Sequence, residues 1–177
     1  MPFHLSSLPR RALISALVAG CLVASVPQMG QAQVPAFKLA VAGAVSQDDK
    51  IAAFYRARDF EPIWTGASTQ DLARREAFLE ALTMAQLHGL PAARYDADGL
   101  MAMMGQARTS QDRGAVEVAM TRAFLLYAHD IQTGILTPGK VVSGIKRDVP
   151  LRDPIVTLTS LTQGDPRAAI RALAPSS

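Results

Sequence analysis

The chain has only one cysteine among its 177 residues, and this residue, Cys21, lies in an apolar stretch near the N-terminus. The sequence beyond that stretch contains no thiol, which excludes a disulfide, a thiolate nucleophile and a cysteine-ligated metal site there. Histidine is also scarce: only His88 and His129 follow residue 32, and neither has a second ligand at metal-binding spacing. We interpret one as a helix-terminus residue and the other as a partly exposed surface residue.

Several short motifs that carry chemistry are missing as well. The sequence has no glycine-rich phosphate loop, no serine nucleophile elbow and no interleaved basic and aromatic residues. It therefore predicts no catalytic residue, no bound cofactor and no metal site in the chain itself.

The first residues have the organisation of an export signal. Arg10 and Arg11 precede an apolar run over residues 12–26, and the small-x-small triplet Gly30-Gln31-Ala32 follows. This order predicts a signal peptide over residues 1–32, cleaved after Ala32. The run is shorter than the roughly 20 apolar residues of a membrane-spanning helix, so we expect no transmembrane helix after cleavage.

Cys21 leaves an alternative open. The sequence Val18-Ala19-Gly20-Cys21 is similar to the lipobox of bacterial lipoproteins, in which the cysteine is acylated and becomes the new N-terminus. The apolar stretch continues to Val26, as expected if Cys21 is one apolar residue within a longer hydrophobic region. We favour a soluble exported protein and keep lipoprotein anchoring as the alternative.

Removal of the leader changes the charge of the protein. The full chain has 18 basic and 15 acidic residues, and without Arg10 and Arg11 the balance is 16 to 15, a net charge of +1. A nearly neutral protein gives no support to nucleic-acid binding. Removal of 32 of the 177 residues leaves 145, which is enough for one domain with its own core.

Helix start and stop signals divide the rest of the chain. Residues 33–45 are rich in alanine and valine without a clear period, which predicts a flexible entry segment before a domain over 46–177. Ser46 to Asp49 has the form of a capping box, and the helix that follows is expected to stop near Arg58.

Later segments carry further helix signals. Ser68 and Asp71 form a second capping box, which opens a long segment that Gly89 closes. A shorter helix is expected over 96–106. Residues 115–133 have an apolar stripe with helical spacing, formed by Val116, Met120, Ala123, Phe124, Tyr127 and Ile131.

Two more helix starts are written alike, as Asp153-Pro154 and Asp165-Pro166, each an N-cap followed by proline in the first turn. Between them and the long helix lies an irregular connector, residues 135–152. No segment alternates strongly enough to predict a strand. The fold class is therefore mostly α-helical, with a single domain after the signal peptide.

The stretch FYRARDFEPIWTG, residues 54–66, concentrates four aromatic side chains around a turn. We interpret Trp64 as a buried corner of the core in preference to a ligand-stacking platform, because buried aromatic residues mainly supply packing area. Asp59 and Glu61 are expected to point to opposite sides of an extended segment, so they predict a solvated edge and not a glycan-cleaving pair.

Three glutamates lie among arginines at helical steps, and we interpret Glu76, Glu80 and Glu117 as members of ordinary ion pairs on exposed helix faces. A hydrolase that uses Glu117 or Glu80 as its acid is the weakest of the functions considered.

Three longer segments, IAAFYRARDFEPIWTG, AFLEALTMAQLHGLPAARYDADGL and VEVAMTRAFLLYAHDIQTGILTPGKV, resemble the N-terminal scaffold domain of the large murein L,D-transpeptidases of Gram-negative bacteria. The resemblance covers about residues 50–175. The matching residues are Phe54, Tyr55, Pro62 and Trp64; then His88, Gly89, Leu90, Tyr95 and Asp96; then Phe124, Tyr127, Asp130, Gly134 and Pro138.

The resemblance implies a periplasmic protein of peptidoglycan remodelling. Family members form 3→3 cross-links between stem peptides, through a cysteine in a Ser/Thr-His-Gly-Cys motif on a separate C-terminal domain. Here Leu90 follows His88-Gly89 and no cysteine follows Cys21, so no catalytic residue is carried over. The chain ends at RALAPSS directly after a helical segment, which we interpret as truncation.

Two functions of different class follow from this reading. In the first, the chain is the scaffold part of an L,D-transpeptidase, inactive alone, whose partner is the missing C-terminal catalytic domain or a separate cell-wall enzyme. The alternative is a free-standing periplasmic adaptor that binds peptidoglycan or a protein.

Overall fold

The computed structural model describes residues 29–135 and 151–174, and all regular secondary structure within them is helical. This confirms the mostly α-helical fold class. The α-helices are α1 (Met29–Ala44), α2 (Asp49–Ala57), α3 (Thr69–Thr83), α4 (Ala97–Gln106), α5 (Ser110–Thr133), α7 (Pro154–Gln163) and α8 (Pro166–Arg171), and two 3-10 turns are η1 (Ala85–His88) and η2 (Ala92–Arg94).

Most helix ends lie where the sequence placed them. The Ser68 side chain accepts from the Asp71 amide while the Asp71 carboxylate accepts from the Ser68 amide, so the capping box of α3 is formed on both sides. Gly89 closes η1 with a positive φ of 71°. The side chains of Asp153 and Asp165 cap α7 and α8, each followed by proline at the first helical position.

The expectation of a flexible entry segment over residues 33–45 was wrong, because residues 33–44 lie in helix α1. Phe37, Val41 and Val45 recur every fourth residue and are all buried. The small residues let α1 approach α5 closely: a Cβ atom added to Gly114 would lie 2.6 Å from the Ala40 Cβ. The low charge of this segment therefore reflects burial and not disorder.

Two other helix starts differ from the prediction. The cap of α2 is Asp48, whose carboxylate accepts from the Ile51 amide, and not Ser46. Helix α5 begins at Ser110, five residues earlier than expected, because Thr109 and Asp112 form a capping box of their own. The residues of this capping box are of the types that predict a helix start, so the earlier start could have been predicted from the sequence. The irregular connector predicted between α5 and α7 lies largely in 136–150, outside the described residues.

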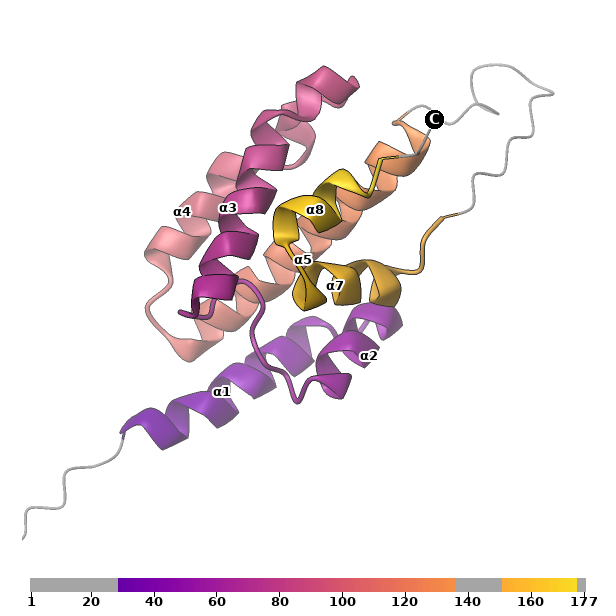
Figure 1. Cartoon of the computed structure of the whole chain (residues 1–177). Helices are drawn as coiled ribbons and strands as arrows, with labels where there is room; N and C mark the ends of the chain where they lie inside the picture. The colour runs from indigo at the N-terminus through magenta and orange to yellow at the C-terminus, as the bar shows by residue number, and fades with distance from the viewer. Residues whose placement is uncertain (1–28, 136–150, 175–177) are drawn as a thin grey trace, which may run out of the picture.

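Helix α5 is the central element of the fold. It contacts α1, α4 and α7, while α3 packs against α8 and α2 against α7. In Figure 1, α5 runs diagonally through the molecule, with α1 and α2 along its lower side and α3 and α4 at the upper left. The predicted stripe faces the core, and Val116, Met120, Phe124 and Tyr127 are buried. Side chains of α5 also reach α2 and α3, since Glu117 accepts from Tyr55 and Phe124 packs on Phe78.

The aromatic corner is part of this core, as predicted. Trp64 is fully buried, with its ring centroid 5.4 Å from that of Phe78 on α3 and 5.7 Å from that of Phe124 on α5. Its Nε1 donates a hydrogen bond of 2.9 Å to the Thr121 hydroxyl. A fully enclosed indole ring cannot stack on a ligand, so Trp64 joins α3 and α5 through packing area.

Glu117 departs most from the sequence prediction. It was expected in an exposed ion pair, but its side chain is fully buried and accepts hydrogen bonds from the segment before α3. Its Oε1 accepts from the Ile63 amide at 2.7 Å and from the Tyr55 hydroxyl at 2.8 Å. Its Oε2 accepts from both the amide and the hydroxyl of Thr65 at 2.8 Å, and the Trp64 amide lies 3.2 Å from both oxygens.

The donors around Glu117 are fixed in turn. Burial, and then the adjacent Glu117, raise the pKa of Tyr55 well above its usual value, so the phenol keeps its proton and donates it. Thr121, one turn after Glu117, lies 2.7 Å from the same phenol oxygen. A single buried carboxylate therefore satisfies three consecutive backbone amides of a segment that is neither helix nor strand.

We predict that Glu117→Gln lowers the free energy of unfolding by about 2–4 kcal/mol, because an amide NH₂ group would face N–H and O–H donors. Urea denaturation at unchanged m value measures this loss. Glu76→Gln, on the exposed face of α3, serves as the matched control and should change stability by less than about 0.5 kcal/mol. Equal losses in the two variants would contradict the role of Glu117.

Candidate functional site

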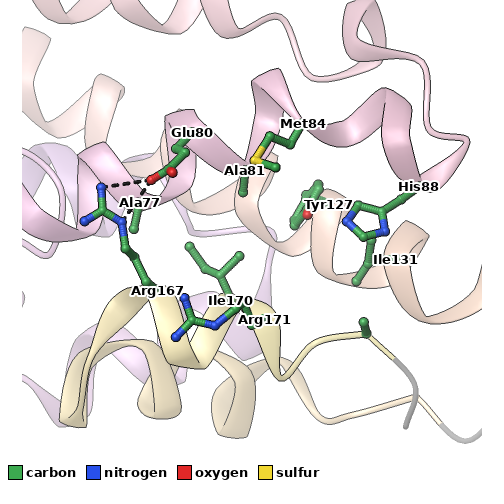
Figure 2. Close-up of a pocket in the computed structure, with 11 residues that line it drawn as sticks. Ala77, Glu80, Ala81, Met84, His88, Tyr127, Ile131, Arg167, Ile170 and Arg171 are labelled. Carbon is green, nitrogen blue, oxygen red and sulfur yellow. Dashed lines mark hydrogen bonds and ion pairs between the residues drawn. The ribbon is translucent and has the colours of Figure 1, made fainter. Parts of the chain in front are cut away.

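A groove of about 330 Å³ opens between α3, α5 and α8 (Figure 2). Its apolar surface comes from Ala77, Ala81 and Met84 on the α3 side, Ile131 on α5 and Ile170 on α8. Met84 is about half exposed, so the groove presents apolar surface to solvent. Charged and polar residues lie at its two ends, which gives the groove an amphipathic character.

One end of the groove is formed by an ion-pair network that joins α8 to α3. Arg167 donates through Nε to Glu80 Oε2 at 2.9 Å, and a terminal nitrogen lies 3.3 Å from Glu76. The hydrogen bond to Glu80 raises the pKa of Arg167 above its usual value, so the guanidinium stays charged. The prediction of exposed ion pairs is confirmed for Glu76 and Glu80. Their partner is Arg167, which lies 87 residues beyond Glu80. A pairing over this separation cannot be predicted from helical spacing.

The other end of the groove carries His88, at the end of η1. Figure 2 shows its imidazole near Ile131, on the opposite side of the groove from Glu80 and Arg167. His88 is exposed, as its predicted position at a helix terminus implies. Among the residues that the structure describes, no three His, Cys, Asp or Glu side chains gather to hold a metal ion.

The turn that follows His88 is held by the buried carboxylate of Asp130. Asp130 Oδ2 accepts from Arg94 Nε at 2.5 Å and from the Tyr95 hydroxyl at 3.0 Å, which fixes η2 against α5. His129 is half exposed, and its Nδ1 lies 3.3 Å from Asp130 Oδ1. Sequence reasoning gave Asp130 no structural role, although its place in the third motif of the resemblance was a usable signal.

The electrostatics of Asp130 combine two opposing effects. Burial raises the pKa of the carboxyl, whereas hydrogen bonds from Arg94, His129 and Tyr95 lower it. The hydrogen bonds prevail, so the pKa of Asp130 lies below its usual value. Burial and the hydrogen bond to Asp130 raise the pKa of Tyr95, which remains a neutral donor.

The remaining acidic candidates confirm the prediction of a solvated edge. Asp59 is 82% exposed and pairs with Lys38, and Glu61 is 72% exposed with Arg58 at 3.9 Å. Both line one surface cavity, where each has a basic partner of its own. Of the two glutamates considered as an acid, Glu117 is enclosed by its own donors and cannot reach a substrate. Glu80 lies in the groove and is paired with Arg167.

The described part of the chain is thus a helical module whose buried acids maintain its own turns. Residues 49–177 match the family model described as Scaffold domain, which covers more than half of the chain. The protein belongs to this family, in agreement with the resemblance to the scaffold domain of L,D-transpeptidases. The comparison with curated proteins and that with solved structures returned no match.

The helices were also compared with the requirements of a lipid bilayer. Within residues 29–135 and 151–174, none combines the length and the apolar character that crossing the bilayer demands.

Asp130→Asn should lower stability by about 2 kcal/mol at pH 7, because an amide NH₂ group would replace an acceptor for Arg94 or Tyr95. The pKa of Asp130 is depressed by folding. Its contribution is therefore complete above the unfolded value of about 3.9 and is lost as pH falls through the folded value. The penalty of the substitution should shrink below about pH 4.

Urea unfolding at pH 7 and at pH 3 measures this difference. The exposed Asp98 provides a control variant, Asp98→Asn, which should cost less than about 0.5 kcal/mol at pH 7. A penalty for Asp130→Asn that stays constant between the two pH values would exclude this account of Asp130.

Proposed function

We propose that the chain is the scaffold portion of a periplasmic L,D-transpeptidase that remodels peptidoglycan, and that it has no catalytic role by itself. One observation carries this proposal: most of the described residues of the family resemblance hold the fold together. Tyr55 and Trp64 surround Glu117, while Tyr95 donates to Asp130. Residues that make such contacts stabilise the fold and are not catalytic groups.

The other motif residues support the same view. Asp96 caps α4 through its side chain, Gly89 and Gly134 adopt positive φ after η1 and α5, and Phe124 packs on Trp64. Pro138 lies outside the described residues. A thiolate nucleophile for the family reaction has to come from another domain or protein, because the only thiol of the sequence is Cys21. The partner in this proposal is accordingly a C-terminal catalytic domain or a separate cell-wall enzyme.

The alternative function is a free-standing adaptor that binds peptidoglycan or a protein partner. The observation in its favour is the groove between α3, α5 and α8, where Met84 exposes apolar surface. Exposed apolar surface beside charged residues is typical of contact sites. The same groove also suits a contact with a catalytic domain, so retention on the cell wall is the property that separates the two functions.

One experiment with purified protein and isolated sacculi tests both functions. We expect the chain to remain in the supernatant after sedimentation, and mass spectrometry of the digested wall to reveal no new 3→3 dimers. Salt-resistant sedimentation with the sacculi would favour the adaptor. New dimers would show that the chain is catalytic and overturn the scaffold proposal.

We also propose that the protein is exported and processed after Ala32. Mass spectrometry of protein recovered from the periplasm should then give a mature N-terminus at Gln33. A diacylglycerol-modified Cys21 would identify a lipoprotein instead, and an intact Met1 would contradict export through a cleaved signal.

A further inference from the structure

Tyr127 of α5 differs from the other tyrosines in the surroundings of its hydroxyl. The sequence has three tyrosines, and all three are buried. The Tyr55 hydroxyl donates to Glu117, and the Tyr95 hydroxyl donates to Asp130. Among the residues that the structure describes, none forms a hydrogen bond with the Tyr127 hydroxyl, and the pKa of this phenol is raised by burial alone. A polar group in a buried residue normally has a partner, so this one requires an explanation.

The Tyr127 hydroxyl opens into the groove between α3, α5 and α8. The residue is only 3% exposed, and it lines this groove. In the described part of the chain, the fully enclosed side-chain atoms without a partner are Arg58 Nε and Arg113 Nε, so the Tyr127 oxygen retains contact with solvent. Figure 2 shows Tyr127 toward the end of the groove that carries His88 and Ile131. A molecule in the groove can therefore reach this hydroxyl.

Packing fixes the ring that carries the hydroxyl. The Tyr127 ring meets the Phe78 ring at 6.2 Å and the Tyr95 ring at 5.6 Å between centroids, edge to face in both pairs. These contacts involve the ring carbons, and a phenylalanine would make them equally well. Burial raises the pKa of Tyr127, so the phenol keeps its proton and can donate it. The hydroxyl is thus a preorganised donor that the core does not use.

The walls and the volume of the groove define the body of a ligand. Met84, Ile131 and Ile170 supply apolar contact surface. The thioether of Met84 is about half exposed, and thioethers contact aromatic rings favourably. The volume of about 330 Å³ lies near the lower limit of small-molecule sites, about 300 Å³. A molecule with a single aromatic ring suits this space.

The ionic groups of the groove do not require a charged ligand. Arg167 contacts Glu80 at 2.8 Å, and Arg171 lies 3.9 Å from Asp165. These side chains are exposed, so water also screens their charges. His88 is exposed as well, which leaves its ring nitrogens accessible to water. A neutral molecule can therefore occupy the groove without separating an ion pair.

From the unpartnered hydroxyl and the apolar walls we infer that the groove is a binding site for a compact neutral aromatic molecule with one hydrogen-bonding oxygen. The oxygen accepts from the Tyr127 hydroxyl, and the ring lies against Met84 and Ile131. Phenols and aromatic ketones with one ring belong to this class. The inference goes beyond the proposed function and does not rest on it, because neither a scaffold nor an adaptor requires a small ligand.

The test compares 4-methylphenol with toluene, which lacks only the hydroxyl. Both are titrated into the full chain labelled with ¹³C at its methionine methyl groups. We expect the Met84 methyl signal to shift, while that of Met101, on α4 outside the groove, stays in place. The phenol should bind at least about threefold more tightly than toluene. Equal affinities of the two molecules, or an unchanged Met84 signal, would overturn the inference.

A variant identifies the hydroxyl that is responsible. Tyr127→Phe keeps the ring contacts and takes no partner from a described group, so it should fold as stably as the unaltered chain. It should bind toluene as before and lose the preference for 4-methylphenol. Ser160→Ala removes a hydroxyl of α7 outside the groove and should retain this preference. A preference that persists in Tyr127→Phe would refute the role of Tyr127.

A charged analogue tests the neutral character of the ligand. In 4-methylbenzoate a carboxylate replaces the hydroxyl, and we expect this anion to bind more weakly than 4-methylphenol, because it loses hydration without gaining a cation. Tighter binding of the anion would exclude the neutral class.

Discussion

The carboxylate of Glu117 is the interaction on which the rest of the structure depends. It lies on the central helix and accepts the amides of Ile63, Trp64 and Thr65, which have no helix or strand to pair with. Without this acceptor the segment could not pass through the core, because buried amides need partners. The position of Trp64 follows from it, and so does the packing of α3 against α5 through that indole.

Much of the fold could be predicted from local chemistry, and the exceptions have a common cause. The capping box at Ser68 and the proline after Asp153 act within a few residues, so the sequence displays them directly. The hydrogen bonds that Glu117 accepts join residues 52 to 62 positions apart in the sequence. A glutamate among helical arginines resembles a surface residue when only its neighbours in the sequence are considered. The burial of α1 was missed because Phe37, Val41 and Val45, at every fourth position, stand among alanines and other small residues that make the segment look uniformly apolar.

The candidate sites differ in the same way. The burial of Trp64 could be predicted from its residue type alone. The groove is formed by residues of three helices, so it could be found only once the positions of these helices were known. The buried acids Glu117 and Asp130 accept hydrogen bonds from the turns of the domain itself, and the groove between α3, α5 and α8 is lined by Glu80, by arginine and histidine, and by apolar side chains.

The first residue of the family match and the first residue of the folded domain are not the same, as helix α1 shows. The family match begins at residue 49, yet Phe37, Val41 and Val45 belong to the core and Gly114 is shaped for contact with Ala40. A recombinant fragment trimmed to the matched residues would uncover this strip of α5, and exposed apolar strips promote aggregation. Expression boundaries for this domain therefore belong ahead of Phe37.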